Sequence, residues 1–375
     1  MKILVLKENR KGENRVALTP DLISKYNKIG YDILVEKSAG ENCSVTDKQF
    51  KENGAKIIDD IDKEIPKADI IIKVSSPDND EIKKLSKAKK NTLLIATLNP
   101  YYEKDNIKSY ADYNLSAVAV ELFPRITRAQ SMDVLSSQSN LAGYRAVIDA
   151  TYELDIAMPM MMTAAGTVSP AKVMILGAGV AGLQAIATAK RLGAVVSAFD
   201  VRAAVKEQVQ SLGAKFIEVE SDDESGETKG GYAKEMSEDY KKRQEKAIFD
   251  NIVKQDIVIT TALIPGKPAP ELISEDMVKS MKEGAVIVDM AAIAGGNCAL
   301  TQSGKVVKKY GVKIIGYDNI ASRISGDASK LYAKNLYNFI ELITDKQTGQ
   351  ITVDLEDEII KASLLTHKGE ILFKG

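Results

Sequence analysis

The segment Val173-Met174-Ile175-Leu176-Gly177-Ala178-Gly179-Val180-Ala181-Gly182 decides the fold of this chain. Its four apolar residues are typical of a buried strand, and its three glycines have the spacing G-x-G-x-x-G. A helical pattern follows over residues 181–192, and Asp200 lies 18 residues beyond Gly182, at the end of the next predicted strand. A strand, a glycine turn, a helix and a late acidic residue in this order indicate a dinucleotide-binding βαβ unit.

Each part of this unit has a physical role toward a dinucleotide. Gly177 permits the tight turn, Gly179 lets the backbone approach the pyrophosphate, and Gly182 lets helix and strand pack closely. The free N–H groups at the helix N-terminus attract the anionic pyrophosphate. The Asp200 carboxylate can accept hydrogen bonds from the ribose and repels a 2′-phosphate, whereas Arg202 alone would favour one. We therefore expect NAD(H) rather than NADP(H).

The alternation of strands and helices extends over most of the chain. Around the glycine turn, buried strands are predicted at residues 173–176, 195–199, 256–260, 285–289 and 313–315. The N-terminal third has a second set of strands, at 3–6, 33–35, 69–74, 92–96 and 117–120, and helices at 20–29, 46–53, 80–89 and 105–113. Apolar runs separated by helices indicate parallel sheets covered on both faces. The predicted fold class is α/β, with two Rossmann-like, doubly wound parallel sheets.

Two long helical patterns, at residues 137–154 and 329–344, follow the last strand of each block. If the second helix returns to the N-terminal block, that domain is discontinuous. We therefore predict a first domain of residues 1–136 and 322–375. The second, NAD(H)-binding domain is predicted to comprise residues 137–321, with a cleft between the two domains.

Composition excludes several classes of protein. Lys and Arg number 51 and Asp and Glu 52, so no basic field is available for nucleic acid or anionic lipid. Two cysteines, Cys43 and Cys298, and one histidine, His367, are too few for a disulfide framework or a clustered zinc site. We expect no metal and a cytoplasmic location. The longest uncharged stretches fall short of the roughly 20 residues of a membrane span, so membrane contact would require a partner.

Two polar segments each have two interpretations. Residues 221–231 contain no apolar side chain, so they form either a tolerated surface insertion or a mobile lid anchored by Tyr232. Residues 124–136 follow the last strand of the first block and are expected to line the cleft. Their polar side chains could hold a nicotinamide, or could equally cap a helix and form surface ion pairs.

Few side chains offer proton transfer, which a dehydrogenase acting on a carbonyl requires. His367 is expected at the surface near the C-terminal end. Lys73 lies in the apolar run 70–74 and is expected to be buried, either with a shifted pKa or in a salt bridge.

Several longer strings resemble one family of proteins. Residues 13–20 (ENRVALTP) resemble the N-terminal motif shared by alanine dehydrogenases and nicotinamide nucleotide transhydrogenases. Residues 124–140, 230–236 (GGYAKEM) and 260–270 (TTALIPGKPAP) resemble the transhydrogenase alpha subunit more specifically. The resemblance extends along nearly the whole chain. It implies the NAD(H)-binding domain I of proton-translocating NAD(P)+ transhydrogenases, present as a separate polypeptide.

The resemblance also implies functional residues. Those at the nicotinamide end, which would position the hydride transfer, are Arg125, Gln130, Asp133 and Ser136, with Arg128 as a further contact. The other implied NAD contacts are Gly177, Gly179, Val180, Gly182, Asp200, Val201, Arg202, Gly231, Tyr232, Gln244 and Leu263. The loop near residues 219–236 would close over the nucleotide.

Partners follow from the same resemblance. NADP(H) would bind to a partner subunit, membrane-embedded subunits would translocate protons, and this chain would form a homodimer on the cytoplasmic face of the inner membrane. The alternative is an amino-acid dehydrogenase like alanine dehydrogenase. Lys73 matches the lysine of that enzyme, but Asn99 stands near the place of its histidine, and Ile293 replaces its acidic residue. Hydride transfer between two nicotinamides held close needs no such acid or base.

Overall fold

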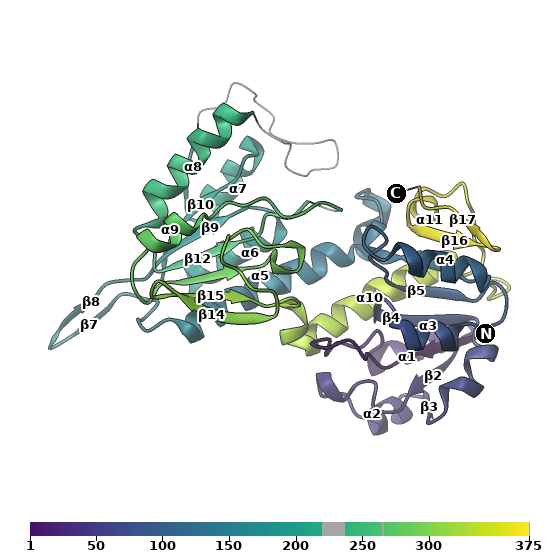
Figure 1. The fold of residues 1–375 in the computed structure, drawn as a ribbon. Helices are drawn as coiled ribbons and strands as arrows, with labels where there is room; N and C mark the ends of the chain where they lie inside the picture. The colour runs from purple at the N-terminus through teal and green to yellow at the C-terminus, as the bar shows by residue number, and fades with distance from the viewer. Residues whose placement is uncertain (220–236, 265, 375) are drawn as a thin grey trace. The chain divides into compact units, whose positions relative to one another are not determined.

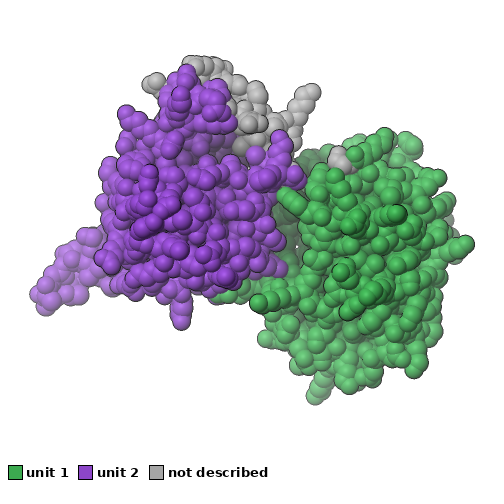
Figure 2. All heavy atoms as spheres, in the orientation of Figure 1, with its two compact units in different colours: residues 1–138, 322–375 green, residues 139–321 purple. Residues whose placement is uncertain are grey.

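The structure, a computed structural model, describes residues 1–219, 237–264 and 266–374 (Figure 1). The predicted lid at 221–231, with Gly231 and Tyr232, lies outside these residues. The chain divides into two compact units (Figure 2). Unit 1 comprises Met1–Gln138 and Ser322–Gly375, and unit 2 comprises Ser139–Ala321.

Unit 1 contains an eight-stranded sheet in the order β17-β16-β6-β5-β4-β1-β2-β3. Its parallel strands are β1 (Lys2–Val5), β2 (Asp32–Glu36), β3 (Lys56–Ile58), β4 (Ile70–Ser75), β5 (Leu93–Thr97) and β6 (Ser116–Ala119). β16 (Leu364–His367) pairs antiparallel with β6, and β17 (Glu370–Ile371) antiparallel with β16. Its helices are α1 (Pro20–Lys28), α2 (Asp47–Glu52), α3 (Asn79–Leu85), α4 (Lys104–Asp112), α10 (Ser325–Ile343) and α11 (Glu358–Ser363).

The core of unit 1 lies on both faces of this sheet, as a doubly wound fold requires. Ile70 and Ile72 of β4 belong to one apolar cluster, whereas Ile71 belongs to the other. All three are fully buried. Because successive residues of a strand point to opposite faces, an unbroken apolar run is the pattern of a strand covered on both sides.

Unit 2 contains a seven-stranded sheet in the order β11-β10-β9-β12-β13-β15-β14. Its strands are β9 (Lys172–Leu176), β10 (Val195–Phe199), β11 (Lys215–Phe216), β12 (Ile257–Thr260), β13 (Val286–Asp289), β14 (Lys305–Lys309) and β15 (Val312–Gly316), and only β14 is antiparallel. Its helices are α6 (Val180–Arg191), α7 (Lys206–Ser211), α8 (Glu238–Ile252) and α9 (Glu275–Ser280). The long helix α5 (Val134–Glu153) contains the boundary between the units.

The predicted fold class is confirmed, and each of the ten predicted strands is present to within one residue. A two-stranded hairpin, β7 (Met161–Thr163) and β8 (Gly166–Val168), was not predicted. It projects from the rest of unit 2 (Figure 1), and its residues are exposed. Among the described helices, none is both long and apolar enough to cross a bilayer.

Candidate functional site

The glycine turn between β9 and α6 has the geometry of a phosphate-binding turn. Gly177 has φ +99°, a value that side chains disfavour, and a Cβ on Gly182 would lie 1.9 Å from the Gly177 carbonyl oxygen. Both positions therefore require glycine. A Cβ on Gly179 would find only the Arg202 Nη2 atom, 3.8 Å away, within 4 Å. This open space beside the backbone fits a bound pyrophosphate group.

The first turn of α6 is suited to an anion. Gly179 is the N-cap, no described side chain caps this end, and the first turn carries no acidic residue. Its leading N–H groups therefore remain available to a phosphate. Val180, the first helical residue, is 39% exposed, which leaves this end accessible.

The Asp200 carboxylate is fixed beside the turn and shared with Arg202. Its Oδ2 accepts a hydrogen bond from the Ala178 amide at 2.7 Å, and its Oδ1 accepts one from the Arg202 amide at 2.9 Å. The Arg202 guanidinium completes a bidentate ion pair, with Nε 2.9 Å and Nη2 2.7 Å from the two oxygens. Since this pair neutralises the carboxylate in part, Arg202 is held as its partner rather than as an isolated phosphate ligand.

The remaining predicted contacts in unit 2 have different surroundings. Burial and the Asp200 charge raise the pKa of the Tyr240 phenol, so this face of α8 lies near Asp200. Gln244, half-buried, follows one turn later on the same helix. Leu263 is 43% exposed beyond the end of β12, as an apolar ligand contact must be, whereas Val201 packs against the core.

Two residues at this edge of the sheet were missed from the sequence. The Thr261 hydroxyl donates to the Gly177 carbonyl at 3.0 Å, which joins the end of β12 to the glycine turn. Tyr240 is the other. A threonine after a strand and a tyrosine in a polar helix carry no distinctive local signal, so the sequence alone could not have singled them out.

The residues predicted for the nicotinamide end lie in unit 1, in and around the 3₁₀ segment η5 (Thr127–Met132). The Asp133 carboxylate accepts hydrogen bonds from the amide and hydroxyl of Ser136, at 2.8 and 2.6 Å. Arg128 forms an ion pair of 2.6 Å with Asp357. Helix capping and a surface ion pair, one of the two interpretations of this segment, are therefore both present. Arg125 and Gln130 are exposed.

The η5 segment is held from behind by α10. The Nδ2 atoms of Asn335 and Asn338 both donate to the Ser131 carbonyl, at 2.9 and 2.8 Å. The Asn335 Oδ1 atom accepts from the Ser137 hydroxyl at 2.8 Å. These bonds fix the backbone on either side of Gln130 and Asp133, while the Gln130 side chain faces solvent.

The cations of unit 1 that could bind an acidic substrate are paired with buried carboxylates. Lys73 is fully buried, contacts Glu81 directly and lies 3.8 Å from Glu8. Arg15 is bound by Glu13 at 2.8 and 2.6 Å and by Gln138 at 2.8 Å. The prediction that Lys73 is buried is confirmed, and of its two interpretations the salt bridge is the one observed.

The expectation of an exposed His367 is wrong. It ends β16, where it is half-buried, and its Nδ1 lies 2.8 Å from the Ser116 hydroxyl. Burial lowers its pKa. The error arises because the C-terminal segment adds strands to the sheet of unit 1 instead of ending on its surface.

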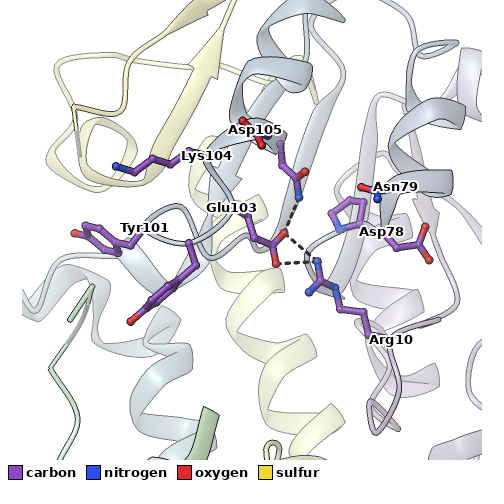
Figure 3. A pocket seen from close by; sticks show the side chains of 10 residues that line it. Arg10, Asp78, Asn79, Tyr101, Glu103, Lys104 and Asp105 are labelled. Atoms are coloured by element: carbon purple, nitrogen blue, oxygen red, sulfur yellow. Dashed lines mark hydrogen bonds and ion pairs between the residues drawn. The ribbon is translucent and has the colours of Figure 1, made fainter. Parts of the chain in front are cut away.

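Unit 1 has an open pocket of about 510 Å³ at the carboxyl ends of β1, β4 and β5 (Figure 3). In Figure 3 the Arg10 guanidinium and the Glu103 carboxylate point toward each other, 2.8 Å apart. Glu103 also accepts from Ser76 and, at 2.6 Å, from Asn106. The lining is polar and largely satisfied by its own contacts, and it contains none of the predicted site residues.

Comparison with known proteins defines the class of this chain. Residues 4–142 match the family model "Alanine dehydrogenase/PNT, N-terminal domain", and residues 146–374 match "Alanine dehydrogenase/PNT, C-terminal domain". The chain therefore belongs to the alanine dehydrogenase/PNT family, and it is an oxidoreductase subunit.

Individual relatives narrow this family. The chain is 52% identical to the first of the polypeptides that form NAD(P) transhydrogenase subunit alpha in Rhodospirillum rubrum, over 99% of this chain and 98% of that protein. A crystal structure of transhydrogenase from Sinorhizobium meliloti is 48% identical and superposes with a TM-score of 0.89, over 99% of this chain and 100% of that one. Alanine dehydrogenase of Halomonas elongata is 27% identical over 100% of this chain and 95% of its own. The similarity favours the transhydrogenases.

Proposed function

We propose that unit 2 binds NAD(H) and that hydride passes directly between this nucleotide and NADP(H) on a partner subunit. The observation that carries the proposal is the Asp200 carboxylate, fixed at 2.7 Å from the Ala178 amide of the glycine turn. A carboxylate at this position can accept hydrogen bonds from the adenosine ribose, while the open space at Gly179 admits the pyrophosphate.

The proposed contacts of the nicotinamide end are the residues of η5 and the start of α5. Gln130 would orient the ring, and Arg125, Asp133 and Ser136 would hold the segment and the nicotinamide end. Further proposed contacts are Arg128, Gly177, Val180, Gly182, Val201, Arg202, Gln244 and Leu263, with Gly231 and Tyr232 outside the described residues. Bound nicotinamide supplies the hydride, so these residues need only bind and orient it.

The pairing of Lys73 and Arg15 supports direct hydride transfer over carbonyl chemistry. A lysine buried against two carboxylates is poorly placed to receive a substrate carboxylate, because its charge is already compensated. A dehydrogenase acting on an amino acid would need such a cation and a proton-transfer group.

The proposed assembly contains further subunits. Membrane-embedded partners would carry the NADP(H)-binding domain and the proton pathway, and would hold this chain at the cytoplasmic face of the inner membrane. We also propose a homodimer. The hairpin β7–β8 supports it, because Met160 and Met162 are 60% and 79% exposed, and exposed apolar groups of this kind mark contact surfaces.

Two measurements test the proposal. Titration with NADH and NADPH is expected to give clearly tighter binding of NADH. Addition of an NADP(H)-binding transhydrogenase subunit is then expected to give transhydrogenation. Rapid reduction of NAD+ by L-alanine with the isolated chain would favour the amino-acid dehydrogenase instead. Tight NADH binding without transhydrogenation with any NADP(H)-binding partner would favour a non-catalytic NAD(H) sensor.

A further inference from the structure

A buried carboxylate at the end of β13 organises the loop that follows this strand. Asp289 is fully buried. Its two oxygens accept five hydrogen bonds: from the hydroxyls of Thr260 (3.1 Å) and Thr301 (2.6 Å) and from the amides of Ala291 (3.0 Å), Asn297 (2.8 Å) and Cys298 (3.0 Å). The loop after β13 is thus fixed at its beginning and at its end, and Asn297 is held at a defined place within it.

The Asn297 side chain transfers this order to a second loop. It is fully buried, and its Oδ1 accepts from the Ala262 amide at 3.1 Å. Its Nδ2 donates to the Ala262 carbonyl at 2.8 Å and to the Pro270 carbonyl at 2.7 Å. One side chain therefore satisfies three backbone groups in the loop after β12, as a neighbouring strand would do.

The loop after β12 lies next to the candidate nucleotide site. Thr261, immediately before Ala262, donates to the Gly177 carbonyl, and Leu263 follows. A dinucleotide in a doubly wound sheet lies across the point where the strand order reverses, here between β9 and β12. Asp200, on the β10 side, belongs to the adenosine half, so the β12 side belongs to the nicotinamide half.

We propose that Asn297, held by Asp289, is a positioning residue for the nicotinamide half of the nucleotide. It acts through Ala262: its three hydrogen bonds fix the backbone that presents Leu263, while the adenosine half depends on Asp200 and the glycine turn. This inference rests on the proposed function of unit 2.

The test compares ligands that occupy one half of the site or both. In Asn297→Asp, the carboxylate can still accept from the Ala262 amide but faces the carbonyls of Ala262 and Pro270 without a donor. We expect NADH affinity to fall at least about 10-fold, because buried acceptors lose their partners. AMP, which represents the adenosine half, is expected to bind within about twofold of wild type. Hydride transfer to an NADP(H)-bearing subunit is expected to fall at least as much as NADH affinity.

Two further variants complete the experiment. Asn251→Ala removes an amide-to-carbonyl hydrogen bond of 2.8 Å inside α8 and is expected to leave both affinities unchanged. Thr301→Val removes one donor to Asp289, keeps Asn297, and is expected to give a smaller loss of the same kind. It carries the test if Asn297 variants do not fold.

Three outcomes would overturn the inference. Equal losses of AMP and NADH affinity in Asn297→Asp and Thr301→Val would show a general structural role. Unchanged NADH affinity and hydride transfer in both would show no positioning role. A wild-type chain that fails to bind NADH would overturn the proposed function as well, which separates the two failures.

Discussion

Nucleotide choice depends at the residue scale on a carboxylate that is already paired. Replacement of Asp200 by Ser removes the ribose acceptor and releases Arg202 from its ion pair. We expect NADH affinity to fall about 10- to 100-fold, the range for hydrogen bonds to a charged group. NADPH affinity is expected to rise, since Arg202 can then face a 2′-phosphate. Calorimetric titration of both nucleotides measures the change, and comparable wild-type affinities would contradict the assignment.

Gln130 is expected to act through position. Asn at this place keeps the amide but shortens the side chain by one methylene, and a displacement of about 1 Å can cost about 100-fold in rate. We expect Gln130→Asn to slow hydride transfer at least about 10-fold with little change in NADH affinity. Stopped-flow transfer to an NADP(H)-binding partner measures it. His367→Ala serves as the control with a near-normal rate, and a large loss there would place the chemistry elsewhere.

Glu121 gives unit 1 a pH-dependent stability. Burial raises the pKa of its carboxyl group from 4.5 to about 7, although the amides of Leu98 and Asn99 donate to it. Since the folded state holds this proton more tightly, the stabilisation is fully present below about pH 4.5 and is lost as pH rises to 7. We expect Glu121→Gln to remove this component, about 1.4 kcal/mol for each unit of pKa shift. Urea unfolding of both proteins at pH 5 and pH 8 tests it, and parallel changes with pH would refute it.

At the scale of elements, two glycines of the same turn are expected to differ in kind. Gly182→Ala places a methyl group 1.9 Å from the Gly177 carbonyl oxygen and forces α6 away from β9. We expect a loss of about 1–3 kcal/mol or more in stability. In Gly179→Ala the methyl group meets open space, so stability is expected to change little while NADH binding weakens. Thermal unfolding and NADH titration of both variants separate the effects, and equal destabilisation would contradict this account.

Parallel strands could be predicted because both of their faces are buried. β9 and β4 show this as continuous apolar runs. The strand β14, with the sequence KVVKK, is mostly exposed at the sheet edge, and the hairpin strand β7 is exposed throughout, so neither carries a pattern of burial. The strand β16 owes its place to pairing with β6, a contact that no local pattern encodes.

The candidate site divides in the same way. The glycine turn and Asp200 are close in sequence and could be found from spacing. The pairing of Lys73 with Glu8 could not, because 65 positions separate them (73 − 8) and many other carboxylates could have served. Asp289 and Asn297 were hidden for a related reason, since their partners lie on other loops.

For the whole molecule, separate cores predict separate unfolding. The apolar clusters of unit 1 and of unit 2 share no residue. NADH at 100 times its dissociation constant stabilises its own unit by about 2.7 kcal/mol. We expect calorimetry to show two transitions, of which NADH raises one by about 2–4 °C. A single transition that moves as a whole would show that the units unfold together.

The discontinuity of unit 1 sets an order of events during synthesis. Helix α10 supplies Tyr332, Leu336 and Phe339 to its core, and β16 completes one side of its sheet. A ribosome makes both segments after the whole of unit 2 has emerged. The N-terminal strands must therefore wait, with apolar surface uncovered, while the nucleotide-binding unit can already fold. The nascent chain is most exposed to chaperones and to aggregation during this interval, and a premature stop near residue 321 would leave the first half-built unit unable to close.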